Sequence, residues 1–282
     1  MYTQIGRKII AIFIISIASF SNQFAQEKLE LFPSALLIQP FTANTLKPKF
    51  GFEFKTTINE LSLNVGNSMD ILQFKVNPNT ALSFGADMFT YTLLRSQKSF
   101  HFPVDAVDYL FGFNFGYKTK ISKNDLGARL RISHISAHFV DGHYDKNSNT
   151  WREGREPQVY SREFLEFIPF IKMNNLRLYG GITYIFHIDP SNIGTDQYQL
   201  GFDYFAENVV GKSLTPFIAY DFRLINIYGY TGNNSLEAGI KLGSIDGKGM
   251  SFYVKYFSGY NIHGEYFDVK EHFTALGFNL DL

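Results

Sequence analysis

Hydrophobic and polar residues alternate one by one through most of the chain from about residue 60 onward. Residues 105–120 show the pattern clearly, because aromatic residues face mainly small or polar ones: Tyr109, Phe111, Phe113, Phe115 and Tyr117 against Leu110, Gly112, Asn114, Gly116 and Lys118. Side chains of a β-strand point alternately to opposite faces, so this period predicts strands with one apolar and one polar face. Repeated over segments of about ten residues with turn residues between them, the pattern is typical of a transmembrane β-barrel.

Twelve such segments follow one another, and the predicted fold is all-β: an antiparallel transmembrane β-barrel of about 12 strands within residues 57–282. The segments are 60–66, 69–76, 80–95, 105–120, 126–140, 162–173, 176–188, 197–207, 214–226, 234–243, 250–261 and 271–282. Short connections, such as residues 172–176, alternate with longer ones, such as residues 141–161. Outer-membrane barrels have short periplasmic turns and longer external loops, an asymmetry that a soluble β-sandwich does not require. The sequence therefore favours a membrane barrel.

The first 25 residues predict a secretory signal peptide. Arg7 and Lys8 precede a short apolar run at residues 9–20, and a small residue follows at Ala25. Twelve apolar residues are too few to cross a hydrocarbon core of roughly 30 Å as a helix. Together with the barrel pattern, this leader predicts the outer membrane of a Gram-negative bacterium as the location, with outer-membrane lipids as partners.

Residues 26–56 precede the predicted barrel and are interpreted as a periplasmic lead-in segment or a strap against the barrel. Pro33, Pro40 and Pro48 interrupt regular structure there. At the end of this segment, Phe50–Lys55 alternates briefly and could form a short extra strand.

Charge and composition narrow the function. Lys plus Arg and Asp plus Glu number 26 each, so no global field points to nucleic acid, and no cysteine is present for a disulfide or a thiolate metal site. Charged residues of both signs fall on the inward phase of the predicted strands: Arg129, Arg131, Arg162, Glu166, Lys172, Arg177, Asp203, Asp221, Arg223, Glu237, Lys241 and Lys255. Pairing across strands would satisfy them without a large pore, which disfavours a general porin but leaves a narrow selective channel open.

Reactive residue types concentrate in residues 126–145. The segment begins with apolar even-numbered positions, while Arg129 and Arg131 lie on the odd-numbered face. Further along, the even positions become His134, Ser136 and His138. Either these three side chains face outward, or a bulge near residues 132–134 turns them into the lumen.

This strand resembles one in the outer-membrane phospholipase A and the lipid A deacylase. Both carry a His-x-Ser pair at the lipid-facing outer rim of a barrel, and a neighbouring strand supplies an Asn or Glu that orients the histidine. The resemblance implies acyl-ester hydrolysis with Ser136 as nucleophile, His134 as base and Glu163, on the outward phase of the next strand, as orienting residue. Residues two apart on a strand lie about 6.6 Å apart, within reach for imidazole and hydroxyl. After the serine, this sequence has Ala137 and His138 where those enzymes have an Asn-rich continuation.

A broader resemblance covers most of the mature chain. Residues 133–142, SHISAHFVDG, are similar to the H-x-S-S-H-x-G-D-E pattern of a bacterial family known only as a conserved domain of unknown function (1207). The opening at residues 32–51, FPSALLIQPFTANTLKPKFG, is similar to the proline-containing opening of that family, whose members look like exported proteins. The family implies no established activity.

Other polar residues near this strand are candidates for binding instead of catalysis: His138, Asp141, His143 and Arg131. His134 and His138 lie about 13 Å apart on a regular strand, too far to share one metal ion, so we expect no metal site from this pair.

No cofactor is predicted, although one loop leaves calcium open. Asp145, Asn147, Asn149 and Glu156 have the spacing of a calcium loop, with Thr150 at the sixth position in place of glycine. Two functions therefore remain in view: a structural, recognition or narrow channel barrel, and a lipid-facing acyl-ester hydrolase.

Overall fold

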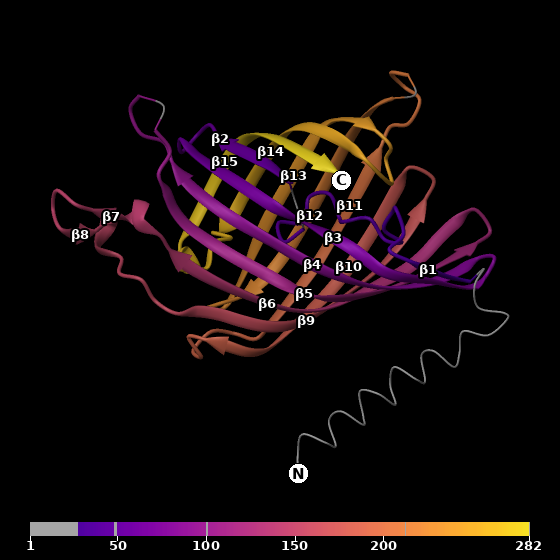
Figure 1. Cartoon of the computed structure of the whole chain (residues 1–282), viewed down its shortest axis with the longest axis horizontal. Coiled ribbons are helices and arrows are strands. Elements are labelled where there is room, and N and C mark those ends of the chain that lie inside the picture. Colours follow the sequence, from indigo (N-terminus) through magenta and orange to yellow (C-terminus); the bar gives the residue numbers. More distant parts are fainter. Residues whose placement is uncertain (1–27, 48–49, 100, 212, 282) are drawn as a thin grey trace, which may run out of the picture.

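The chain forms a closed antiparallel β-barrel, which confirms the predicted fold class (Figure 1). The computed structural model describes residues 28–47, 50–99, 101–211 and 213–281, so the predicted signal peptide lies outside the described residues. Twelve strands make the wall. In chain order they are β2 (Phe50–Lys55), β3 (Glu60–Asn77), β4 (Thr80–Arg95), β5 (Val104–Ile121), β6 (Asn124–Phe139), β9 (Tyr160–Met173), β10 (Leu176–Asp189), β11 (Asp196–Phe205), β12 (Leu214–Asn226), β13 (Tyr230–Gly243), β14 (Gly249–Tyr260) and β15 (Lys270–Asp281).

The barrel closes at β3. One edge of β3 pairs with β4, and the other edge pairs with β2, which in turn pairs with β15. Closure matters because backbone N–H and C=O groups in a hydrocarbon environment need partners within the protein. Among the described residues, no helix has the length and apolar character needed to cross a membrane.

The first two predicted strands, 60–66 and 69–76, are in fact one continuous strand, β3. Residues 66–68, where the two predicted segments were divided, pair in unbroken register with β4. A bulge follows, between Asp70 and Leu72. The twelfth strand is β2, the segment that the sequence offered only as an extra strand, so the wall begins at Phe50 and not after residue 56.

A short strand, β1 (Leu29–Leu31), lies in line with β2 along the same edge of β3. β1 pairs with residues 72–74 of β3, and β2 pairs with residues 60–64. The chain between them leaves this line and enters the barrel. β1 and β2 are thus two pieces of one interrupted strand, and we call the inserted residues 33–47 the lumen segment.

The lumen segment contacts the inner wall on several sides. The backbone N–H of Leu37 donates to Asp70 of β3 (2.8 Å), and that of Thr42 donates to Asp203 of β11 (3.0 Å). Arginines of β6, β10 and β12 also donate to it. Contact with strands all around the ring is possible only from inside. The segment interpreted as a periplasmic lead-in therefore fills the lumen over most of its length, because buried charges of the wall take its backbone as partner.

Apolar side chains cover the outside of the wall, and charged pairs fill the inside. Phe111, Phe113 and Phe115 of β5 are exposed on the outward face, as the alternation predicted. The inward side chains form buried ion pairs, among them Arg129–Asp87 (2.7 Å), Arg131–Glu166 (2.9 Å) and Lys255–Glu53 (3.1 Å). The mixed charges on the inward phase are therefore partners of one another.

The two ends of the barrel differ in their connections. At the short-turn end, two-residue turns join β3 to β4, β5 to β6 and β9 to β10. At the long-loop end, residues 96–103, 140–159 and 261–269 connect the strands. These connections follow the asymmetry that the sequence predicted, whereas residues 206–213 at the short-turn end are more numerous than residues 227–229 at the long-loop end.

Arg177 tests the anchoring of the lumen segment. Its guanidinium donates to the carbonyls of Gln39 (2.8 Å) and Pro40 (2.7 Å), pairs with Asp203 (2.5 Å) and lies over the ring of Phe41 (4.6 Å). Because Arg177→Ala leaves a buried carboxylate without its guanidinium, we expect the free energy of unfolding to fall by about 3 kcal/mol. Denaturant unfolding in detergent measures this change.

The same variant should expose the lumen segment to added protease from the short-turn end. Arg152→Ala is the matched control, because Arg152 lies in the 140–159 loop, far along the barrel from this contact. Equal protection of the lumen segment in Arg177→Ala and in the wild type would show that this arginine does not hold it.

Candidate active site

Strand β6 keeps its alternation to the end, so His134, Ser136 and His138 face outward. The pairing of β6 with β5 and β9 is unbroken through these residues, without a bulge. The intervening Ile135 and Ala137 are buried inside the barrel, at 1% and 4% exposure. Of the two orientations that the sequence left open, the structure has the outward one.

Glu163 joins histidines from both neighbouring strands. On β9 it lies directly opposite His134 of β6 and directly opposite His187 of β10. His134 Nδ1 is 2.6 Å from Glu163 Oε1, and His187 Nδ1 is 2.5 Å from Glu163 Oε2. Each carboxylate oxygen thus accepts one imidazole N–H, and the three side chains form a row across the outward face, here called the His–Glu–His row.

Strict alternation from the inward Arg177 would put His187 on the inward face as well, but in the structure it faces outward. A bulge in β10 between Ile185 and His187 adds one residue to the strand relative to β9. As a result Phe186 and His187 both face outward, and the His187 side chain is 68% exposed. A bulge inverts the facing of the residues beyond it, and the two-residue period of the sequence carries no mark of it.

Ser136 lies in the next row towards the long-loop end. It is directly opposite Ser161 of β9 and two residues from His134 on the same face of β6. Among the contacts of the described residues, Ser136 Oγ makes no hydrogen bond, and His134 uses only its Nδ1. The hydroxyl and the Nε2 of His134 are therefore both available to a bound molecule.

The polar side chains on this face are here called the outward patch: His134, Ser136, His138, Ser161, Glu163 and His187. Aromatic rings of β5 border it. The ring of Phe111 lies 5.0 Å from that of His134, and the ring of Tyr109 lies 5.7 Å from that of His138. Since the same face of β5 continues as exposed Phe113 and Phe115, the patch stands at the edge of the apolar band of the barrel. A side chain in this position meets lipid.

The structure places His143 inside the protein, away from the outward patch. It is fully buried, with Nδ1 2.8 Å from Asp105 Oδ1 and Nε2 3.1 Å from the carbonyl of Arg155, and its ring stacks on Phe139 at 3.8 Å. His143 ends a short 3-10 turn that Asp141 begins, η1 (Asp141–His143). His143 therefore anchors the 140–159 loop.

Arg131, another binding candidate, is also inside the protein. Its guanidinium is buried, pairs with Glu166 (2.9 Å) and donates to the carbonyl of Leu46 (3.1 Å). Its contacts are with the wall and the lumen segment. Of the predicted binding residues, only His138 is shown exposed beside Ser136.

The loop after β14 closes over the inner face of the site strand. His263 is fully buried with Nδ1 2.8 Å from Asp108 Oδ2, and the hydroxyl of Tyr266 donates to Asp105 (2.5 Å). Burial, with the hydrogen bond to Asp105, raises the pKa of Tyr266 above its ordinary value. A Cβ added to Gly264 would lie 2.6 Å from that of Ala137, so only glycine allows this close packing behind Ser136.

Of the residues with calcium-loop spacing, Asp145, Asn147 and Asn149 lie in an exposed hairpin formed by β7 (Tyr144–Asp145) and β8 (Thr150–Trp151), and Glu156 lies beyond it. Asp145 accepts the backbone N–H of Asn147 (3.0 Å), and this hydrogen bond is the main cause that lowers the pKa of its carboxyl. Asn149 accepts the hydroxyl of Tyr144 (2.7 Å). Within the described part of the chain, no group of three or more His, Asp or Glu side chains is arranged to hold a metal ion.

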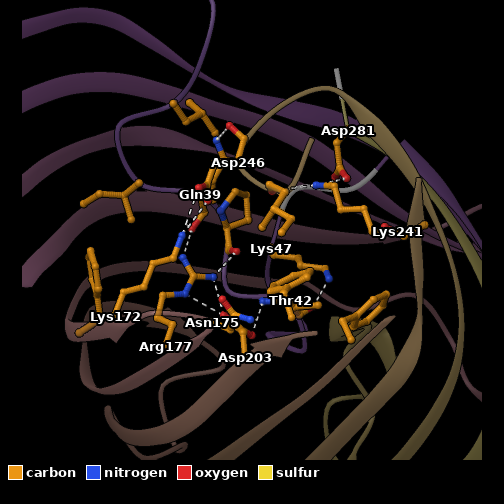
Figure 2. Close-up of a pocket in the computed structure, with 18 of the residues that line it drawn as sticks. Gln39, Thr42, Lys47, Lys172, Asn175, Arg177, Asp203, Lys241, Asp246 and Asp281 are labelled. Carbon is orange, nitrogen blue, oxygen red and sulfur yellow. Dashed lines mark hydrogen bonds and ion pairs between the residues drawn. The ribbon is translucent and has the colours of Figure 1, made fainter. Parts of the chain in front are cut away.

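A second candidate location is a cavity of roughly 160 Å³ between the lumen segment and the wall. Figure 2 shows its charged side chains beside one another, with Arg177 next to Asp203 and Lys241 next to Asp281. Lys172 and Asp246 form a third pair at 3.1 Å. Because these charges neutralise one another, the cavity offers less chemistry than the outward patch.

The closed twelve-stranded barrel, apolar outside and charged inside, is the fold of outer-membrane β-barrel proteins. Within that class, the chain belongs to the family described as "Protein of unknown function (DUF1207)", whose model matches residues 106–281 and so includes β6, β9 and β10. A comparison with curated proteins found no match.

Solved structures with this fold include outer-membrane phospholipase A from Escherichia coli. It is 14% identical, with 82% of this chain and 90% of that chain covered and a TM-score of 0.51. The Salmonella typhi outer membrane phospholipase, described as a dimer with bound calcium, is also 14% identical, with coverages of 86% and 94% and a TM-score of 0.52. At this identity the likeness shows the fold alone.

His143→Ala tests the anchoring of the 140–159 loop. The change removes a buried ring and its hydrogen bonds to Asp105 and the loop backbone, so we expect a loss of about 2 kcal/mol and faster proteolysis within the loop. Limited proteolysis in detergent micelles measures the second effect. His138→Ala, which removes an exposed histidine, should leave the cleavage rate unchanged, and similar rates for both variants would contradict the anchoring role.

Proposed function

We propose that this protein lies in the outer membrane of a Gram-negative bacterium, with its long-loop end outside, and hydrolyses acyl esters of membrane lipids. Ser136 is the nucleophile, His134 the base and Glu163 the orienting residue. The observation that carries the proposal is the 2.6 Å hydrogen bond between His134 Nδ1 and Glu163, on the lipid-facing side of the wall beside Ser136.

Each group has a role that its geometry supports. Glu163 accepts the Nδ1 proton of His134, which leaves the lone pair of Nε2 free to act as base. Ser136 Oγ attacks the ester carbonyl while His134 Nε2 takes the hydroxyl proton. The same proton passes to the departing alcohol oxygen, and an acyl-serine remains. Water, deprotonated by His134, then attacks this ester and releases the fatty acid and the free serine.

The position of the site suits a lipid substrate. A lipid in the membrane has its ester groups at the boundary between headgroups and hydrocarbon, and the patch stands at the edge of the exposed apolar band. The similar folds are named as outer-membrane phospholipases, and one of them is described with bound calcium. Assays with and without calcium are therefore part of the test.

The central experiment follows release of fatty acid from phospholipid or lipopolysaccharide by the purified protein in mixed micelles. Ser136→Ala should lower kcat by about 1,000-fold or more, because the hydroxyl that accepts the acyl group is then missing. Glu163→Ala should lower it by about 10- to 100-fold, since the imidazole then loses its orientation. Ser161→Ala is the matched control: it removes the serine directly opposite and should keep the activity.

Full activity in Ser136→Ala would refute the assignment of the nucleophile. So would the absence of fatty-acid release by the wild type across these lipids at high and low calcium.

The filled interior of the barrel favours a function on its outer, lipid-facing surface over ion conduction through the lumen. The lumen segment and the inward ion pairs occupy the inside, and most of the charges around the remaining cavity are paired. We expect no steady ion conductance when the purified protein is inserted in planar bilayers. A stable open conductance that changes with Arg131→Ala would instead favour the narrow selective channel.

A further inference from the structure

The bulge in β10 brings a histidine to the site that alternation alone would place inside the barrel. It lies between Ile185 and His187, and three further residue pairs of β10 with β9 follow it. Bulges break the hydrogen-bond ladder locally, and they recur next to functional sites where a side chain has to be re-aimed. Here the re-aimed side chain is His187, and its Nδ1 meets Glu163 Oε2 at 2.5 Å.

Glu163 is held from both sides as a result. It is a long side chain on an open face and is 28% exposed, so without a second contact its carboxylate would rotate freely about its terminal bonds. The hydrogen bond from His134 fixes one oxygen, and the hydrogen bond from His187 fixes the other. The plane of the carboxylate is then determined by β6 and β10 together.

We propose that His187 is a positioning residue that acts through Glu163 on His134. This inference rests on the proposed ester hydrolysis for its effect on rate. By occupying Oε2, His187 keeps Oε1 on the Nδ1 of His134 and so keeps the base in the tautomer whose Nε2 is free. The carboxylate of Glu163 thus accepts hydrogen bonds from two imidazoles. That of His134 is the base, and that of His187 holds the carboxylate in place.

An alternative role for His187 is direct contact with the substrate, and the first experiment below distinguishes it from positioning. Its side chain is 68% exposed, so its Nε2 is open to a bound lipid, where it would contact the substrate directly. A positioning residue needs only the Nδ1 donor, whereas a substrate contact needs the second nitrogen. Asparagine places an amide N–H close to where histidine has Nδ1 and has no counterpart of Nε2.

The first experiment therefore compares His187→Ala with His187→Asn in the fatty-acid release assay. We expect kcat to fall about 10- to 100-fold in His187→Ala, with KM little changed, and to recover in His187→Asn. His272→Ala is the matched control, because His272 is an exposed histidine of β15 without contact to Glu163. Failure of asparagine to restore kcat would overturn the positioning role.

The second experiment needs no activity. The chain has seven histidines, so ¹⁵N labelling of histidine in micelles gives few signals, and single substitutions assign them. We expect His134 to carry its proton on Nδ1 in the wild type and to shift towards a mixture of tautomers in His187→Ala and in Glu163→Ala. His187→Asn should retain the wild-type signal.

The two readouts keep the two proposals apart. An inactive wild type with the expected ¹⁵N coupling would overturn the ester hydrolysis and support the role of His187 in holding Glu163. A His134 signal that does not change in His187→Ala would overturn that role, whatever the activity.

Discussion

The constraint on which the structure depends is the pairing of the backbone within the wall. In hydrocarbon, unpaired N–H and C=O groups are costly, so the sheet closes on itself at β2 and β3. Closure then sorts the side chains strictly, because successive residues of a strand point to opposite sides. One side faces lipid and has to be apolar, and the other faces a narrow interior and has to be satisfied by the protein itself.

The interior shows the consequence of this sorting. Buried charges are tolerated only when each finds an opposite charge or a hydrogen-bond partner. The wall supplies part of this through pairs such as Arg129 with Asp87, and the lumen segment supplies more through its backbone at Leu37 and Thr42. Because the strand formed by β1 and β2 is interrupted, the lumen segment between them can enter the barrel and fill it.

The same sorting decides what the sequence could predict. Alternation put Glu163 on the outward phase of β9 but left the facing of His134 open, because only the pairing with β9 shows that β6 has no bulge. The contact between His134 and Glu163 was implied by the resemblance to the outer-membrane phospholipase A and the lipid A deacylase. His187 could not be found, since the bulge of β10 depends on pairing with β9 and leaves no period in the sequence. His143 has a reactive side chain but is buried against Asp105, 38 positions away in the chain, and only the fold brings the two together.

The outward patch is the exception to this sorting, because polar side chains lie there on the lipid-facing side. Its hydrogen bonds bear on its role. A polar network kept only for stability would satisfy its members, because each unpaired group next to lipid has a cost. Glu163 is satisfied on both oxygens by imidazole donors. Among the contacts of the described residues, the hydroxyl of Ser136 and the Nε2 of His134 have no hydrogen-bond partner, and these are the proposed nucleophile and base. The Nε2 of His187 is open as well. The carboxylate is thus held on both sides, while the two atoms that would act on a substrate stay free to do so.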